Sequence, residues 1–80
     1  MKSVYILRSL TRPATYYTGV TDDVQRRLAE HNSGKCPHTL TARPWELVTV
    51  IAFAAPQRAI AFEHYLKSGS GRAFAQRHFR

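Results

Sequence analysis

Eighty residues are enough for one small folded domain, and we expect a single domain over residues 1–80. The composition is ordinary for a folded protein, and no apolar run approaches the roughly 20 residues of a membrane-spanning helix, which argues against disordered and membrane-embedded classes. The formal net charge of +7 predicts a polyanionic partner, most often nucleic acid, unless the charge serves only to solubilise the surface.

The single cysteine, Cys36, excludes an internal disulfide and fits a reducing compartment. The first ten residues lack the long apolar stretch and small-residue cleavage site of a signal peptide, so we expect a cytoplasmic location. We do not expect Cys36 to be a catalytic nucleophile, because it precedes Pro37 in a loop and His38 has no evident orienting partner.

Two strands are predicted near the start of the chain. Residues 3–9 are β-branched, aromatic and apolar on both faces, as in a central strand. Residues 16–20 are rich in side chains that fit a pleated surface. A proline-containing loop joins them, so the two strands are expected to form a β-hairpin.

A helix is predicted to begin after the hairpin and to run to about Asn32. Thr21 or Asp22 can accept hydrogen bonds from the free N–H groups of its first turn, and Gln25 approximates a capping box with Asp22. Gly34 can adopt the left-handed conformation that ends a helix.

The second half of the chain predicts one more strand and two helices. Residues 45–53 form an apolar strand, and residues 56–67 form a helix with a proline in its first turn. The segment 68–71, SGSG, interrupts that helix, and residues 72–79 make a short last one. The order β-β-α-β-α-α predicts an α+β fold with a small, mainly antiparallel three-stranded sheet flanked by helices.

The first helix places two polar residues beside its core-facing stripe. Four residues share one face through their i, i+3, i+4 and i+7 spacing: Val24, Arg27, Leu28 and His31. The two aliphatic members are expected to pack in the core. Arg27 is then either a core-edge residue with a buried stem or an anion contact, and His31 is either an edge histidine or its functional partner. Arg26 and Glu30 are expected to pair in solvent.

Two tyrosines can lie beside this stripe. Tyr5 and Tyr17 share one parity along their strands, so a register that pairs odd with odd residues puts both rings on one face of the sheet. If the first helix covers that face, the phenols lie near Arg27 and His31; otherwise they are ordinary strand aromatics. Tyr16 is expected to pack on the opposite face.

Four short motifs occur in order along the chain: "SVY" at 3–5, "YTG" at 17–19, "TDDVQRRLAEH" after them and "FEHYLK" in the later helix. The residues of interest in them are Tyr5, Tyr17, Gly19, Arg27, His31 and Glu63. In this ordered set the chain resembles the GIY-YIG nuclease family, of the small stand-alone bacterial type. The resemblance implies metal-dependent endonucleolytic hydrolysis of phosphodiester bonds in DNA, with one divalent ion, Mg²⁺ or Mn²⁺.

The resemblance also implies a role for each of these residues. Glu63 would be the metal ligand, although its spacing equally allows an ion pair with Lys67. Tyr5 would be the general base, and Arg27 would hold a phosphate oxygen. Because an ordinary tyrosine has a pKa of about 10, the phenol needs a nearby cation or a proton acceptor.

The remaining family positions would support this chemistry. Tyr17 would position the phosphate or a water, and His31 would take a proton from the first-strand phenol or orient it. Gly19 would be structural, because a side chain there would crowd the backbone at the strand end. The chain departs from the family at Val20, where some members carry a lysine, and at residues 75–76, where many carry an asparagine.

Other basic residues predict contacts to DNA outside the reacting centre. Lys35, Arg43 and Arg72 are candidates, and the segment 68–71 is either a phosphate-binding nest beside Arg72 or a flexible joint. A branched, damaged or single-stranded DNA is the expected substrate. The alternatives are a non-catalytic nucleic-acid-binding module with the nuclease fold, and a domain that docks onto a larger repair or recombination protein.

Overall fold

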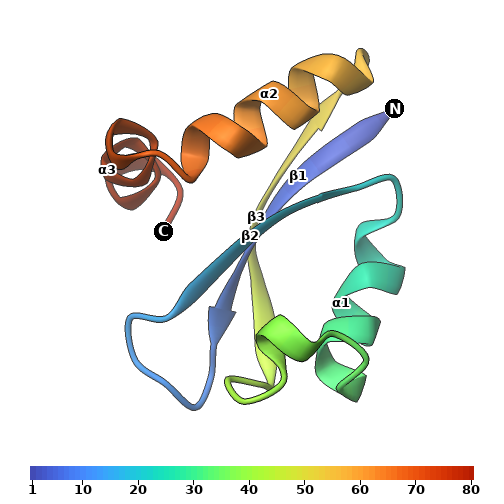
Figure 1. Ribbon diagram of the computed structural model, residues 1–80, viewed down its shortest axis with the longest axis vertical. Helices are drawn as coiled ribbons and strands as arrows, with labels where there is room; N and C mark the ends of the chain where they lie inside the picture. Colours follow the sequence, from blue (N-terminus) through green and yellow to red (C-terminus); the bar gives the residue numbers. More distant parts are fainter.

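A three-stranded antiparallel sheet lies between two helical layers in the computed structural model, which describes residues 1–80 (Figure 1). Its elements are β1 (Lys2–Ser9), β2 (Tyr16–Thr21), α1 (Val24–Ser33), β3 (Trp45–Phe53), α2 (Pro56–Leu66) and α3 (Gly69–His78), with a short 3-10 turn, η1, at Pro37–Thr39. The predicted α+β order is therefore confirmed. None of the helices is both long and apolar enough to cross a membrane.

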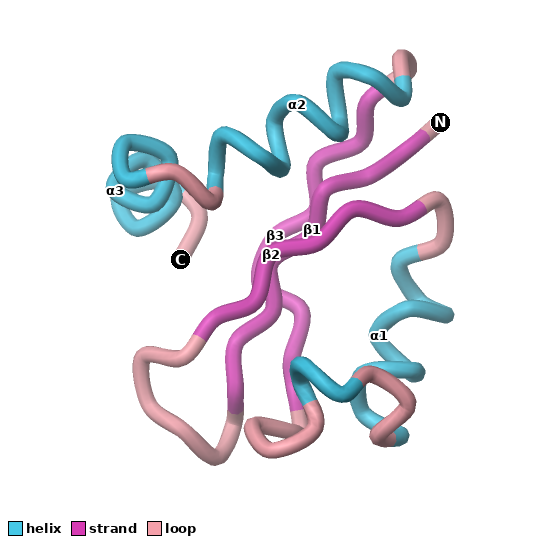
Figure 2. The backbone as a smooth tube through the Cα atoms, in the orientation of Figure 1, coloured by secondary structure: helices cyan, strands magenta, loops and turns pink.

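The sheet has the strand order β2-β1-β3, with β1 in the centre. This position explains why β1 is apolar on both faces, since each face meets a helical layer. Helix α1 covers one face, and α2 and α3 cover the other (Figure 2). In the hairpin Tyr5 lies opposite Gly19 and Leu7 lies opposite Tyr17, so odd residues pair with odd residues as predicted.

Each face of β1 has its own apolar cluster. Val4 and Ile6 pack with Ala59, Leu66 and Ala75 under α2 and α3, and Tyr16 packs against this cluster as predicted. The other face holds the second cluster, formed by Tyr5, Leu7, Ala42 and Trp45, with Tyr17, Val24 and Leu28 against it. Strand alternation thus separates the two tyrosines that neighbour each other in β2 onto opposite faces.

The start of α1 differs from the prediction. The N-cap is Asp23, whose carboxylate accepts the Arg26 N–H at 3.0 Å, so capping by Thr21 or Asp22 was wrong. Thr21 instead accepts the Asp23 N–H at 3.1 Å, which turns the chain before the helix begins. The C-terminal end is as predicted, because Gly34 caps it with a φ of 87°.

The break between α2 and α3 is shorter than the predicted interruption over residues 68–71. Helix α3 begins at Gly69 with Ser68 as its N-cap, so ending the break at residue 71 was wrong. The Ser68 hydroxyl accepts the Gly71 N–H at 3.2 Å and donates to the Tyr65 carbonyl at 2.6 Å. A Cβ on Gly71 would overlap the Tyr65 carbonyl, so glycine is required by the close approach of the two helices. The segment is therefore a capped helix start, while phosphate contact by Arg72 stays a prediction.

Substitution of Gly71 by alanine is expected to destabilise the fold by about 1–3 kcal/mol, because the new methyl group has to push α3 away from Tyr65. Gly69 is the matched control, since nothing lies within 4 Å of a Cβ there and alanine favours a helix. Urea unfolding should show a loss for Gly71→Ala and no loss for Gly69→Ala. Equal stability of the two variants would contradict this account of the junction.

Candidate active site

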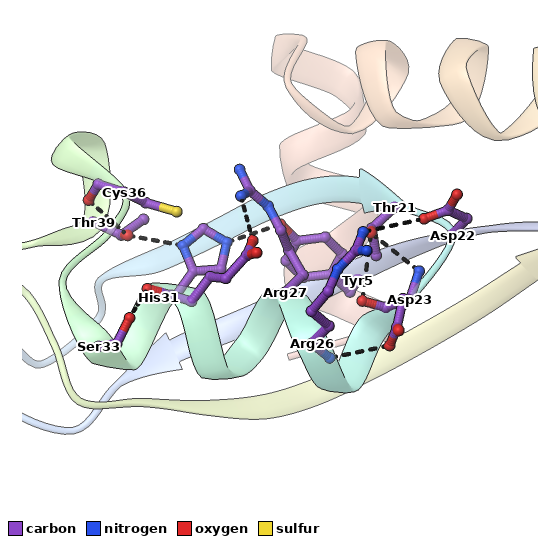
Figure 3. Close-up of polar contacts among 11 residues, drawn as sticks. Tyr5, Thr21, Asp22, Asp23, Arg26, Arg27, His31, Ser33, Cys36 and Thr39 are labelled. Carbon is purple, nitrogen blue, oxygen red and sulfur yellow. Dashed lines mark hydrogen bonds and ion pairs between the residues drawn. The ribbon is translucent and has the colours of Figure 1, made fainter.

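A buried chain of hydrogen bonds joins the first strand to the end of α1. The Tyr5 hydroxyl lies 2.9 Å from His31 Nε2, and His31 Nδ1 lies 2.8 Å from Thr39 Oγ1 (Figure 3). The three residues are at most 2% exposed. A phenol, an imidazole and a hydroxyl are thus held in line inside the protein.

The direction of these hydrogen bonds follows from Thr39. Its hydroxyl donates its only proton to the Cys36 carbonyl at 3.3 Å, so its oxygen accepts from His31 Nδ1–H. His31 Nε2 then carries the lone pair and accepts the Tyr5 O–H. The tautomer assigned by this network makes His31 an acceptor for the phenolic proton.

Burial keeps both partners neutral. It raises the pKa of Tyr5 to about 12, an effect that a hydrogen bond from Arg27 partly opposes. It also lowers the pKa of His31, and the charge of Arg27 adds to that shift. At neutral pH the pair is therefore a phenol that hydrogen-bonds to an unprotonated imidazole, rather than a preformed phenolate.

Two residues of β2, Tyr17 and Gly19, lie on the same face of the sheet as Tyr5. The centroid of the Tyr17 ring lies 4.9 Å from that of His31 and 6.3 Å from that of Tyr5. Gly19 is buried opposite Tyr5, and a Cβ there would overlap the hydroxyl end of the Tyr5 ring. The expected reason for Gly19, crowding of backbone, was wrong: the glycine makes room for the phenol.

Arg27 lies close enough to the phenol to lower its pKa, and it pairs with an acid of its own helix. Its Nη1 lies 2.9 Å from Glu30 Oε1, and this pair raises the pKa of Arg27 and lowers that of Glu30. The expected pair of Arg26 with Glu30 was therefore wrong, since Arg26 contacts Asp22 at 3.6 Å instead. With 37% of its side chain exposed, Arg27 is both a core-edge residue and open to an anion.

Glu63 lies apart from the phenol, on α2. It is 8% exposed, and its Oε2 lies 2.7 Å from Lys67 Nζ, so the ion-pair alternative is present in the structure. Lys67 Nζ in turn lies 5.8 Å from the centroid of the Tyr17 ring. Glu63 is thus connected to the other candidate residues through Lys67 and Tyr17, and no cavity is lined by either Glu63 or Tyr5.

The donor set around Glu63 limits what metal site it could form. No group of three or more histidine, cysteine, aspartate or glutamate side chains converges in the protein. A single carboxylate fits Mg²⁺ or Mn²⁺, which retain several waters and share their remaining positions with a substrate phosphate. Glu63 is therefore suited to a metal that arrives with DNA and unsuited to a preformed protein cage.

The other candidate residues divide between the two faces. Lys35 lines a shallow hollow on α1 together with Glu30, and Arg43 lies against Gly34 at the end of that helix. Both are exposed and belong to the half of the molecule that contains His31. Arg72 is exposed on α3, behind the opposite face of the sheet.

The departures from the family pattern also lie on that opposite side. Val20 and Ala75 pack in the cluster under α2 and α3, while Gln76 is exposed. These side chains do not face the buried phenol, because strand alternation points Val20 away from it.

Comparison with known proteins agrees with this arrangement. The family model for the GIY-YIG catalytic domain matches residues 1–77. The chain belongs to the GIY-YIG nuclease family. The solution NMR structure of a UPF0213 protein from Bacillus halodurans has a TM-score of 0.57 to this fold at 37% identity, covering 95% of this chain and 81% of that one.

Two kinds of curated protein are among the relatives that the chain is similar to. A UPF0213 protein from Streptococcus pneumoniae is 40% identical over 65 residues, which cover 80% of this chain and 64% of the relative. A structure-specific endonuclease subunit, SLX1, from Debaryomyces hansenii is 38% identical over 71 residues, covering 80% of this chain and 20% of that protein. The chain therefore matches less than two thirds of either relative.

Thr39 is the residue of the buried network that sequence reasoning missed. It lies in η1, in a loop without apolar periodicity, so no pattern marks it. Its role becomes visible only when η1 folds against the end of α1 and brings its hydroxyl to His31. We class Thr39 as a positioning residue, since it reaches the phenol only through the imidazole.

Thr39→Val is expected to leave His31 Nδ1–H without an acceptor, which should lower the free energy of unfolding by about 1–3 kcal/mol. Thr39→Ser retains a hydroxyl and should preserve the tautomer. Nitrogen-15 NMR of the histidine ring reports the proton position directly. A valine variant with wild-type ring shifts would contradict the positioning role.

Acid should weaken the fold through His31. Its folded-state pKa lies below the ordinary value of about 6.5, so the unfolded chain takes up the proton first as the pH falls. The His31 contribution to the free energy of unfolding should therefore be complete above pH 6.5 and decline as the pH falls from there toward the lower folded value. NMR titration of the ring checks the shift, and a midpoint at or above 6.5 would contradict it.

Proposed function

We propose that the chain is a metal-dependent endonuclease that hydrolyses phosphodiester bonds in DNA, with Tyr5 as general base. The observation that carries this proposal is the buried Tyr5–His31–Thr39 chain, which provides a proton acceptor behind the phenol. A binding surface has no use for such a relay, because nucleic acid affinity needs only exposed cations and rings.

The proposed reaction starts from the neutral pair. As the attacking water approaches the phosphorus, its proton passes to the Tyr5 oxygen while the phenolic proton passes to His31 Nε2. This coupled transfer avoids a free phenolate, which a pKa of about 12 makes unfavourable at neutral pH. Thr39 then accepts from Nδ1–H throughout, so the ring keeps its orientation.

Arg27 would bind the phosphate at the open edge of the site. Its guanidinium can exchange the Glu30 carboxylate for two oxygens of the phosphodiester and stabilise the charge that develops on them. The charge of Arg27 lowers the pKa of His31, and a bound phosphate would offset that charge. The pKa of His31 would therefore rise when substrate binds, which would make the imidazole a better proton acceptor.

Glu63 is the residue that would hold the divalent ion, Mg²⁺ or Mn²⁺. The ion, when bound, would supply Lewis-acid stabilisation of the phosphate and the leaving oxygen. Lys67 would have to leave Glu63 for the carboxylate to serve as a ligand. Tyr17, whose ring lies near both Lys67 and His31, would position the phosphate or a water.

The names of the relatives support a proposal for the substrate class and the partner. Because the fungal relatives are structure-specific endonuclease subunits, we propose branched DNA as the substrate and a larger repair or recombination protein as the partner. A domain of 80 residues has few contacts with which to read bases, so little sequence specificity is expected from it alone.

A second candidate function is non-catalytic binding of nucleic acid. Its support is that Arg27 and Glu63 are both ion-paired within the chain, to Glu30 and Lys67. If those pairs persist on DNA, the basic surface remains but neither the phosphate nor a metal gains its ligand.

Nicking of plasmid and branched DNA with Mg²⁺ or Mn²⁺ separates the two candidates. Tyr5→Phe should lower the cleavage rate by roughly 10²- to 10⁴-fold, because it removes the proton-transfer group. Glu63→Gln should lower the rate as much by removing the metal ligand, and EDTA should do so by removing the metal. The matched controls Tyr16→Phe and Glu46→Gln should cut like wild type, since both residues lie outside the site.

The variants should still bind DNA. Unchanged affinity with lost cleavage supports the nuclease assignment, whereas a wild-type protein that binds but never cuts any of these substrates would establish the binding module in its place.

A further inference from the structure

An exposed aromatic groove is formed by residues of α3 together with Tyr65 of α2. These two helices cover the sheet face that is remote from Tyr5 and His31 (Figure 1). The groove has a volume of about 320 Å³ and is lined by Tyr65, Ser70, Ala73, Phe74, Arg77 and His78. None of these residues belongs to the proposed catalytic site. The groove is therefore a separate feature whose role the nuclease chemistry does not explain.

The rings of this groove are exposed but held in place. Phe74 is 37% exposed and Tyr65 is 40% exposed, although neighbouring aromatic rings fix both. The Phe74 centroid lies 4.7 Å from that of His78, 5.4 Å from that of Phe79 and 6.2 Å from that of Tyr65. A ring held in this way loses little conformational freedom when a flat ligand stacks on it.

The charge of the groove is positive and uncompensated. Arg77 forms no salt bridge, and Glu63, the only acid among residues 47–80, is buried and paired with Lys67. The ligand should therefore be an anion. A second copy of this chain would bring a like-charged surface, which electrostatic repulsion disfavours.

We propose that this groove binds a single-stranded segment of DNA, with bases stacked on Phe74 and Tyr65 and phosphates beside Arg77. Aromatic faces next to an unpaired cation are the features by which proteins bind single strands without reading sequence. An acidic peptide satisfies the cation but leaves the ring faces without flat partners. A duplex keeps its bases stacked on one another and so cannot use the rings.

This proposal does not require catalysis, so it is tested by binding in EDTA, where cleavage is absent. The probes are a fluorescently labelled oligothymidylate of about eight nucleotides, an abasic oligomer of the same length and charge, a duplex, and an oligoglutamate of equal charge. Fluorescence anisotropy measures the affinity, and thermal unfolding by circular dichroism shows that each variant is folded.

Phe74→Leu keeps an apolar side chain but removes the ring, so it should weaken oligothymidylate binding roughly tenfold and leave abasic binding unchanged. Arg77→Gln should weaken both oligomers, because it removes a phosphate contact. The controls Ile60→Ala and Arg58→Gln, on exposed positions of α2 outside the groove, should bind like wild type. If Phe74→Leu does not fold, Tyr65→Leu makes the same test.

Three results would overturn the proposal: no loss with either ring variant, an equal loss on thymidylate and abasic oligomers, or oligoglutamate binding as tight as oligothymidylate. The effect of Phe74→Leu is then measured again in a chain that also carries Arg27→Gln. This double variant separates binding at the groove from binding at the catalytic site. The same tenfold loss there supports a groove independent of the catalytic site, whereas disappearance of the loss would show that Phe74 contacts the strand only together with Arg27 and would overturn that independence.

Discussion

The hydrogen bond between Tyr5 and His31 is the constraint around which this half of the molecule is arranged. It joins the central strand to the last turn of α1, and both partners are almost fully removed from water. A buried polar pair is tolerable only when every donor and acceptor is satisfied, and the protein has no buried side-chain nitrogen or oxygen without a partner. Gly19 leaves space for the phenol, and Thr39 satisfies the far side of the imidazole.

Ion pairs hold the resting site close to neutral despite the strongly basic chain. Glu30 occupies Arg27 and Lys67 occupies Glu63, so the two charges that would act on a phosphate and a metal are each compensated by a neighbour one helical turn away. The half-exposed Arg27–Glu30 pair contributes little stability, whereas Glu63 is buried and would be costly to leave without a cation. A phosphodiester would therefore replace Glu30 at Arg27 at small cost, whereas Lys67 would leave Glu63 only if a divalent ion took its place.

The sequence predicted the elements and the face on which the tyrosines lie, because strand alternation and helical periodicity are local rules. Parity, with a register that pairs odd with odd residues, predicted Tyr5 and Tyr17 together and Tyr16 opposite. The N-cap was misassigned because three adjacent residues, Thr21, Asp22 and Asp23, can all accept hydrogen bonds, and only the observed turn selects the last. Thr39 could not be predicted at all, since its contact depends on how an aperiodic loop folds back over α1.

The role of Glu63 could not be predicted from sequence patterns alone, because it depends on where the tertiary fold places the carboxylate. Its spacing from Lys67 predicted an ion pair, and its match to the family predicted a metal ligand. The ion pair is present, and the buried carboxylate lies beside an ammonium that lies over Tyr17, so the fold allows both roles. A carboxylate that faced solvent would be free for any cation, whereas this one is reached only after Lys67 moves. An incoming phosphate would attract that ammonium, so an anionic substrate would expose the carboxylate that we propose as the metal ligand. Substrate and divalent ion would then bind cooperatively. The phosphate would draw the Lys67 ammonium away from Glu63, and the ion would neutralise the carboxylate that repels the phosphate.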